Sequence, residues 1–155
     1  MIYVDDLIKR AGEFANGLRY GFFLRDIVTE YEAEICDMNT ENQLFEQGVN
    51  RLGVSIMDYR PYRPLTLEIK AMKGQPTDRV TLRDEGDFHA SFFVTATNSE
   101  FEISADDLKT KDLRKKYGNQ IFGLTDENKN ILTWEYIYPA LLEKAHSLLY
   151  GKSTN

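Results

Sequence analysis

The sequence predicts an α+β fold in which a long N-terminal helix and C-terminal helices pack on a small antiparallel β-sheet. Three observations carry this prediction: an apolar stripe at helical spacing over residues 20–47, two alternating segments on either side of Asn98-Ser99, and a second helical stripe after Pro139. The 155 residues fit one domain, and no repeat or linker divides them. We therefore expect a single domain spanning residues 1–155.

Bulk composition indicates a soluble globular protein. Hydrophobic residues make up 42% of the chain, and no apolar run is long enough to span a bilayer. The N-terminus does not resemble a secretion signal, and Cys36 is the only cysteine, so we expect a reducing cytosol and a structural thiol. A net charge of −6 argues against non-specific binding to a phosphate backbone.

The first stripe predicts a long amphipathic helix over residues 20–47 that ends at Gly48, because a helix can close with a glycine in the left-handed region. We expect the stripe to face the core, although a partner helix would use the same pattern. Its members recur at spacings of three and four: Leu24, Ile27, Val28, Tyr31, Ile35, Met38 and Phe45.

Residues 49–76 show no sustained periodicity of apolar residues and carry three of the four prolines, so we expect mostly extended or looped chain. Residues 64–74 fit either a strand or a helix. Pro64 at a first turn and Gly74 just past an end favour a short helix.

The alternation of apolar and polar residues over residues 92–105 predicts a hairpin with Asn98-Ser99 as its two-residue turn. Residues whose numbers sum to 197 would then lie opposite one another. Phe92 with Ala105, Val94 with Ile103 and Ala96 with Phe101 would share one apolar face, and the other face would be mostly polar.

The C-terminal third predicts three helices. A charged helix over residues 106–117 would be closed by Gly118, and Thr125 would be the N-cap of the next helix. Pro139 would divide that helix, which runs to about Ile137, from a last one that precedes Gly151 and the polar tail 152–155. The last helix would present Leu141, Leu142, Ala145, Leu148 and Leu149 along one face.

The acidic turn, defined by Asp84, Glu85 and Asp87 around Gly86, raises the question of catalysis. Two carboxylates in different environments could act as acid and base, and His89 follows closely. Solvated turns use the same residues, however, and no nucleophile has an identifiable partner here. We interpret the segment as a corner of the fold.

A magnesium-dependent nuclease is the alternative enzyme hypothesis. Asp58 followed by Glu68-Ile69-Lys70 has the acid, acid-x-lysine layout of such enzymes, but this layout needs Glu68 and Lys70 on a strand. The two histidines and the cysteine show no ligand spacing, and no glycine-rich phosphate loop occurs. We assign no catalytic, metal or cofactor-binding residue.

Two other features are candidates for contacts with partners. Aromatic residues cluster at Tyr20-Gly-Phe22-Phe23 and at Tyr59 with Tyr62, where core packing or interface anchoring is favoured over base stacking. A basic run fits either a solvated helix face or a patch for phosphate or a partner; it comprises Lys109, Lys111, Arg114, Lys115 and Lys116.

Three stretches together resemble the small virion morphogenesis, neck or tail-completion proteins of long-tailed phages and prophages. The first runs from Tyr59-Arg-Pro-Tyr62 through Thr66 and Lys70 to Lys73-Gly74. The second is Val80-Thr-Leu-Arg-Asp-Glu-Gly-Asp-Phe-His-Ala-Ser-Phe-Phe-Val94, and the third is Ile121-Phe-Gly-Leu-Thr-Asp-Glu-Asn128. Their order along roughly residues 45–149 carries the resemblance.

The resemblance implies a non-enzymatic structural protein of the head-tail junction or tail terminus. A small adaptor that binds a protein partner outside any virion is the second alternative, beside the nuclease. The expected partners of the structural protein are further copies in a ring and neighbouring connector or tail proteins. Its expected location is the virion, and the host cytoplasm during assembly. DNA would pass through the ring lumen without specific binding, and we expect no membrane contact and no cofactor. Candidate contact surfaces are the exposed side of the long helix, the loop from Tyr59 to Tyr62 and the basic run.

Overall fold

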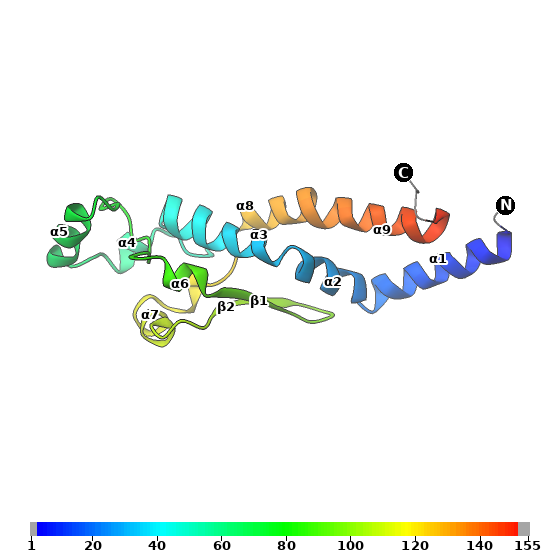
Figure 1. Ribbon diagram of the computed structural model, residues 1–155, viewed down its shortest axis with the longest axis horizontal. Helices are drawn as coiled ribbons and strands as arrows, with labels where there is room; N and C mark the ends of the chain where they lie inside the picture. The colour runs from blue at the N-terminus through cyan, green and yellow to red at the C-terminus, as the bar shows by residue number, and fades with distance from the viewer. Residues whose placement is uncertain (1–2, 152–155) are drawn as a thin grey trace. The chain divides into compact units, whose positions relative to one another are not determined.

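The structure is a computed structural model and describes residues 3–151. It confirms the α+β class: the described chain is mostly helical and contains one two-stranded antiparallel sheet (Figure 1). The elements, in chain order, are α1 (Val4–Arg19), α2 (Phe22–Glu30), α3 (Glu32–Asp37), the π-helical η1 (Met38–Gln47), α4 (Ile56–Tyr59), α5 (Pro64–Met72), α6 (Asp87–Ala90), β1 (Phe92–Ala96), β2 (Phe101–Ala105), α7 (Thr110–Tyr117), the 3-10 turn η2 (Asn119–Ile121), α8 (Asp126–Ile131), the π-helical η3 (Leu132–Ile137) and α9 (Tyr138–Tyr150).

The described chain divides into two compact units. Unit 1 contains residues 3–31, 95–101 and 131–151, and unit 2 contains residues 32–94 and 102–130. Each unit is built from separated stretches, so the two are not consecutive domains along the sequence. The single domain expected over residues 1–155 stays a prediction.

The helix predicted over residues 20–47 forms as three successive elements, α2, α3 and η1. Tyr31 separates the first two, and η1 has the wider π-helical turn. Gly48 ends η1 at a φ of 65°, as predicted for a left-handed glycine. Of the predicted stripe, Ile27, Val28, Ile35 and Met38 are buried, whereas Leu24 is exposed.

Three amide side chains form a buried knot at the centre of unit 2. The Asn39 amide donates to the Ile121 carbonyl at 3.0 Å, and its oxygen accepts from the Gly123 N–H at 2.8 Å. Gln43 donates to the Gly123 carbonyl at 2.9 Å and accepts from the Thr125 N–H at 2.8 Å. The Asn128 amide donates to Gln43 Oε1 at 2.8 Å and to the Met38 carbonyl at 3.0 Å. We call this group the amide knot; it holds residues 121–125 against η1.

The hairpin has the predicted register. Thr97 N–H donates to the Glu100 carbonyl at 2.8 Å and Asp106 N–H donates to the Ser91 carbonyl at 3.3 Å, and both pairs sum to 197. Phe92 and Ile103 are buried, while Phe93, Thr95 and Glu102 are exposed. The alternating face predicted from the sequence is therefore confirmed.

The short helices of unit 2 follow their local signals. Pro64 occupies the first turn of α5, which confirms the helical choice for this segment. The charged helix α7 begins at Thr110, later than the predicted residue 106, and gives way to Gly118. Thr125 caps α8, since its Oγ1 accepts from the Asn128 N–H at 3.3 Å.

Unit 1 is built from helices that lie along one another. Helix α1, which the sequence analysis did not predict, lies beside α9 (Figure 1). Gly17 of α1 packs directly on the ring of Phe23, and Gly21 packs on the backbone of Asn98 at the hairpin tip, where a Cβ would collide. No helix among residues 3–151 is long and apolar enough to cross a bilayer.

The boundary predicted before Pro139 is confirmed as a change of helix type, from η3 to α9, but the chain stays helical across it. The residue lies in the first turn of α9, and Ile137 and Tyr138 keep right-handed helical dihedrals before it. A proline lacks the N–H and crowds the preceding turn, but the wider π-helical η3 directly before it provides space. The predicted apolar face of α9 has no fully buried residue, and the predicted tail 152–155 lies outside the described residues.

The amide knot predicts the effect of Gln43→Leu. This change leaves the Thr125 N–H and the Gly123 carbonyl without a buried partner and removes one of the two hydrogen bonds of the Asn128 amide, so we expect a loss of about 3 kcal/mol in the free energy of unfolding. Urea unfolding followed by circular dichroism measures it. Gln47→Leu, at an exposed position of the same helix, is the matched control. Equal effects of the two changes would contradict a central role for the knot.

Candidate functional site

The acidic turn is a corner of the fold. Gly86 adopts a φ of 106°, which favours glycine, and the chain turns there into α6. Phe88 and Phe92 are buried behind the turn with their rings edge to face at 5.1 Å. Glu85 and Asp87 are exposed and form no ion pair among residues 3–151.

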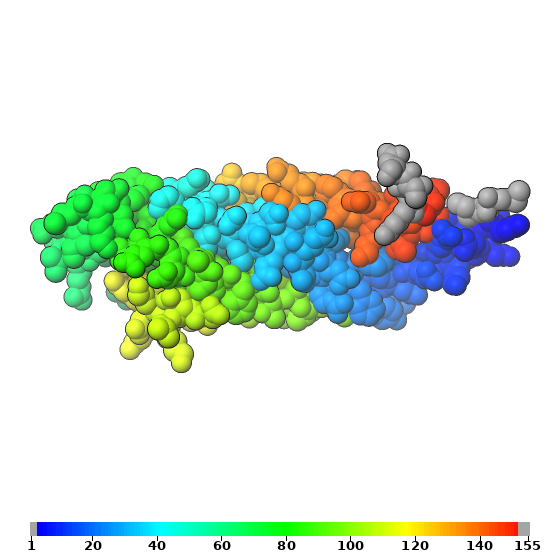
Figure 2. Space-filling view, viewed as in Figure 1, coloured from blue at the N-terminus to red at the C-terminus, as the bar shows by residue number. Residues whose placement is uncertain are grey.

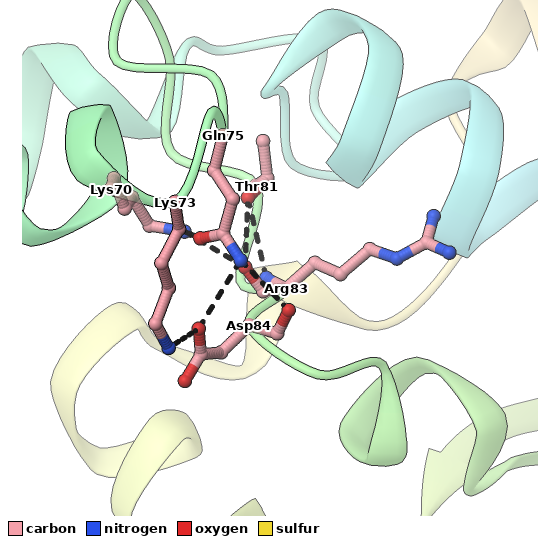
Figure 3. A network of polar contacts seen from close by, with 6 residues as sticks. All are labelled: Lys70, Lys73, Gln75, Thr81, Arg83 and Asp84. Carbon is pink, nitrogen blue, oxygen red and sulfur yellow. Dashed lines mark hydrogen bonds and ion pairs between the residues drawn. The ribbon is translucent and has the colours of Figure 1, made fainter.

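Helix α5 fixes the acidic turn through a polar network (Figure 3). The buried Lys70 ammonium donates to Gln75 Oε1 at 2.9 Å and to the Arg83 carbonyl at 2.8 Å. Gln75 in turn donates to the Asp84 carbonyl at 2.9 Å, and Lys73 forms an ion pair with Asp84 at 2.7 Å. The hydrogen bond from Lys73, reinforced by that from Gln75, lowers the pKa of Asp84.

The backbone between these contacts is strained. Leu82 is buried and has a φ of 53°, an uncommon value for a residue with a side chain. Its neighbours on both sides are held: the Arg83 carbonyl accepts from Lys70, and the Thr81 carbonyl lies 2.9 Å from His89 Nε2. The network therefore fixes the conformation of the turn.

His89 is a core residue. Burial lowers its pKa to about 4, and this effect exceeds that of the hydrogen bond to the Thr81 carbonyl, which raises the pKa. The neutral ring donates from Nε2 to Thr81, while Nδ1 is buried without a partner among residues 3–151. In the same part of the chain no serine or cysteine hydrogen-bonds to the ring, so the described contacts give His89 a packing role.

The nuclease layout considered from the sequence is not formed. Glu68 and Lys70 lie on α5, not on a strand, and the Glu68 side chain is exposed. Lys70 points into the polar network, and Asp58 lies exposed on α4. Within residues 3–151, no group of three or more His, Cys, Asp or Glu side chains is placed to hold a metal ion.

Two surfaces that the sequence suggested separately meet in one basic depression. The loop 59–63 and helix α7 line a hollow of about 460 Å³. The Tyr59 hydroxyl donates to the Tyr117 carbonyl at 3.1 Å, which ties the loop to the end of α7. We call this hollow the basic depression; it is lined by Tyr59, Arg60, Pro61, Arg63, Asp112, Lys115 and Lys116.

The charge of the basic depression is uncompensated. Asp112 is the one carboxylate in its lining, against four cations. Arg60, Arg63, Lys115 and Lys116 form no ion pair within the described chain, whereas Lys73, Arg79 and Arg83 of the same unit each do. Figure 2 shows side chains of the yellow α7 region projecting from the surface. The depression is therefore suited to an acidic group from another molecule.

The basic run divides between core and surface. The Arg114 guanidinium lies over the Phe122 ring at 4.8 Å, and its Nε is buried, so this residue anchors α7. Lys116 contributes both to the basic depression and to a second hollow of about 220 Å³, which the acidic turn and Lys109 also line. Lys111 lines neither hollow and is exposed.

The other singled-out residues have ordinary packing roles. Phe23 stacks on Phe14 at 5.6 Å, and Tyr20 and Phe22 form an exposed pair. Burial and the nearby carboxylates of Glu32 and Asp37 raise the pKa of the Cys36 thiol to about 11. This raised pKa disfavours the reactive thiolate, which agrees with the structural role predicted for Cys36.

Sequence reasoning missed the convergence itself. It named the loop from Tyr59 to Tyr62, which contains Arg60, and the basic run, but it named neither Arg63 nor Asp112. The sequence did contain a signal for a fixed surface here. Pro61 and Pro64 stiffen the loop that carries both arginines. Comparison of the chain with family models, curated proteins and solved structures gave no match.

His89 predicts a pH dependence of stability. The unfolded chain binds a proton at a histidine pKa near 6.5, whereas the folded pKa is about 4. Stability is therefore full above about pH 6.5 and falls as the pH drops toward 4, by on the order of 3 kcal/mol. His89→Gln, which keeps a donor toward Thr81, should flatten this part of the curve in thermal unfolding scans from pH 4 to 7.

The second histidine supplies the matched control. His146 is exposed, and the chain has two histidines. His146→Gln should leave the slope unchanged. A slope that persists in His89→Gln would assign the effect to carboxylates instead.

Proposed function

We propose that this protein is a structural, non-enzymatic subunit of a phage or prophage virion that acts at the head-tail junction or tail terminus and joins further copies in a ring. The basic depression carries the proposal, because it is a preformed, uncompensated surface for an acidic neighbour. Its proposed partners are further copies and adjoining connector or tail proteins. Its proposed location is the virion, and the host cytoplasm during assembly.

The packing of the three stretches that resemble neck and tail-completion proteins supports this proposal. Lys70 of the first stretch donates to the Arg83 carbonyl of the second at 2.8 Å. Phe88 and Phe92 of the second stretch lie 6.2 and 5.3 Å from Phe122 of the third, between ring centroids. Residues that were recognised only by their order in the sequence thus share one structural unit, as a common motif requires.

Exposed apolar side chains in unit 1 also support an assembly role. Helix α1 exposes Val4 and Ile8 by 72% and 64%, and Trp134 of η3 is exposed by 64%. Where such side chains lie together in one patch, they mark a surface that another protein covers. Aromatic residues such as Trp134 and Tyr138, whose rings meet edge to face at 5.5 Å, are favoured anchors in such contacts.

The proposed mechanism is geometric. A closed ring requires a heterologous contact, in which one patch of each copy meets a different patch of the next. The net charge of −6 would then suit a lumen through which DNA slides, because a negative wall does not retain the phosphate backbone. No catalytic step is part of this proposal.

Deleting the gene from the phage or prophage that encodes the protein tests the proposal. We expect electron micrographs of the lysate to show DNA-filled heads and tails that are not joined, or tails of abnormal end structure. Supplying the wild-type gene on a plasmid should restore complete particles. Complete, infectious particles without the protein would contradict the proposed function.

A further inference from the structure

The acidic turn and the basic depression form opposite halves of one possible contact. Both belong to unit 2, so both are surfaces of the same compact body. The turn presents Glu85 and Asp87 without ion pairs, and the depression presents four cations without ion pairs, in the part of the chain that the structure describes. Unpaired charges of opposite sign on one protein suit contact between two copies.

The basic depression is a hollow of about 460 Å³, and the acidic turn is a tight corner around Gly86 with exposed carboxylates on either side. Within one copy, the turn instead lines the second hollow, on whose wall Lys109 and Lys116 lie without forming an ion pair to Glu85 or Asp87. The carboxylates thus remain available to a neighbour.

The acidic turn is also preorganised. Gln75 and Lys73 hold Asp84, Lys70 holds the Arg83 carbonyl, and Phe88 anchors the far side in the core. The depression is held in the same way by the Tyr59 hydroxyl on Tyr117. Surfaces fixed before contact lose little conformational freedom on binding, which favours association.

We propose that the acidic turn of one copy, through Glu85 and Asp87, docks in the basic depression of the next copy, against Arg60, Arg63, Lys115 and Lys116. This inference rests on the proposed function, because it identifies the self-contact by which the subunits join. The two surfaces are different patches of the same chain, so the contact is heterologous, as a ring requires.

A charge exchange between two variants tests the contact. The first variant, Arg60→Glu with Arg63→Glu, makes the depression acidic, and the second, Glu85→Lys with Asp87→Lys, makes the turn basic. Each variant alone brings like charges together, so we expect self-association at least about 100-fold weaker than wild type in sedimentation velocity. An equimolar mixture restores opposite charges at every contact between the two different variants and should associate again.

Salt dependence is a second readout of the same contact. The Debye length falls from about 10 Å at 0.1 M to about 3 Å at 1 M ionic strength, so the wild-type assembly should dissociate progressively over that range. The charge-matched control pairs are Lys9→Glu with Lys111→Glu and Glu46→Lys with Glu68→Lys. All four control positions are exposed and line neither hollow, so both controls should associate as wild type does.

Four outcomes would overturn the inference: either variant associating like wild type, a mixture that stays dissociated, controls that fail like the variants, or a wild-type protein that is monomeric throughout. A monomer that binds duplex DNA through Arg60 and Arg63 would assign the depression to phosphate instead. These measurements use the isolated protein and are therefore independent of the particle experiment. Complete particles formed by a variant that lacks the contact would overturn this inference alone. Self-association through the contact, together with complete particles after gene deletion, would overturn the proposed function alone.

Discussion

The amide side chains buried on η1 must find hydrogen-bond partners, and the rest of unit 2 depends on this constraint. Asn39 and Gln43 lie fully buried on η1, and residues 121–125 supply their partners from the backbone. Fixing this loop places Phe122 against Phe88, Phe92 and the Arg114 guanidinium. Arg114 then sets the position of α7, whose outer face lines the basic depression. The buried amides thus help to hold the surface charge in place through Phe122 and Arg114.

The sequence predicted the parts of the fold that obey a local rule. Gly48 and Thr125 end and begin helices as their chemistry requires, and the hairpin register follows from a two-residue turn combined with period-two alternation. It could not predict that Asn39 and Gln43 are buried, because a polar residue between apolar ones also fits a solvent-facing position. It placed a boundary before Pro139 correctly but did not predict the unbroken helical path there, because the rule for helix breaking assumes regular α-helical turns, and η3 provides a wider one.

The candidate site was predictable only in pieces. The acidic turn was correctly interpreted as a corner, because glycine flanked by carboxylates is typical of a turn, and the structure adds that Asp84 is held by Lys73 and Gln75. The basic run and the loop 59–63 were named as separate candidates. Their convergence arises from a contact across 58 residues of sequence, between the Tyr59 hydroxyl and the Tyr117 carbonyl. No local pattern encodes such a contact, so the depression required the structure.

We propose that the protein joins other copies of itself through surfaces that are already formed in the single chain. Native mass of the unmodified protein, measured by light scattering over a wide concentration range, tests this claim most directly. A discrete high-order oligomer that grows in population with concentration is the predicted result. A strict monomer at every concentration would contradict self-assembly and would require a partner protein to supply the acidic group.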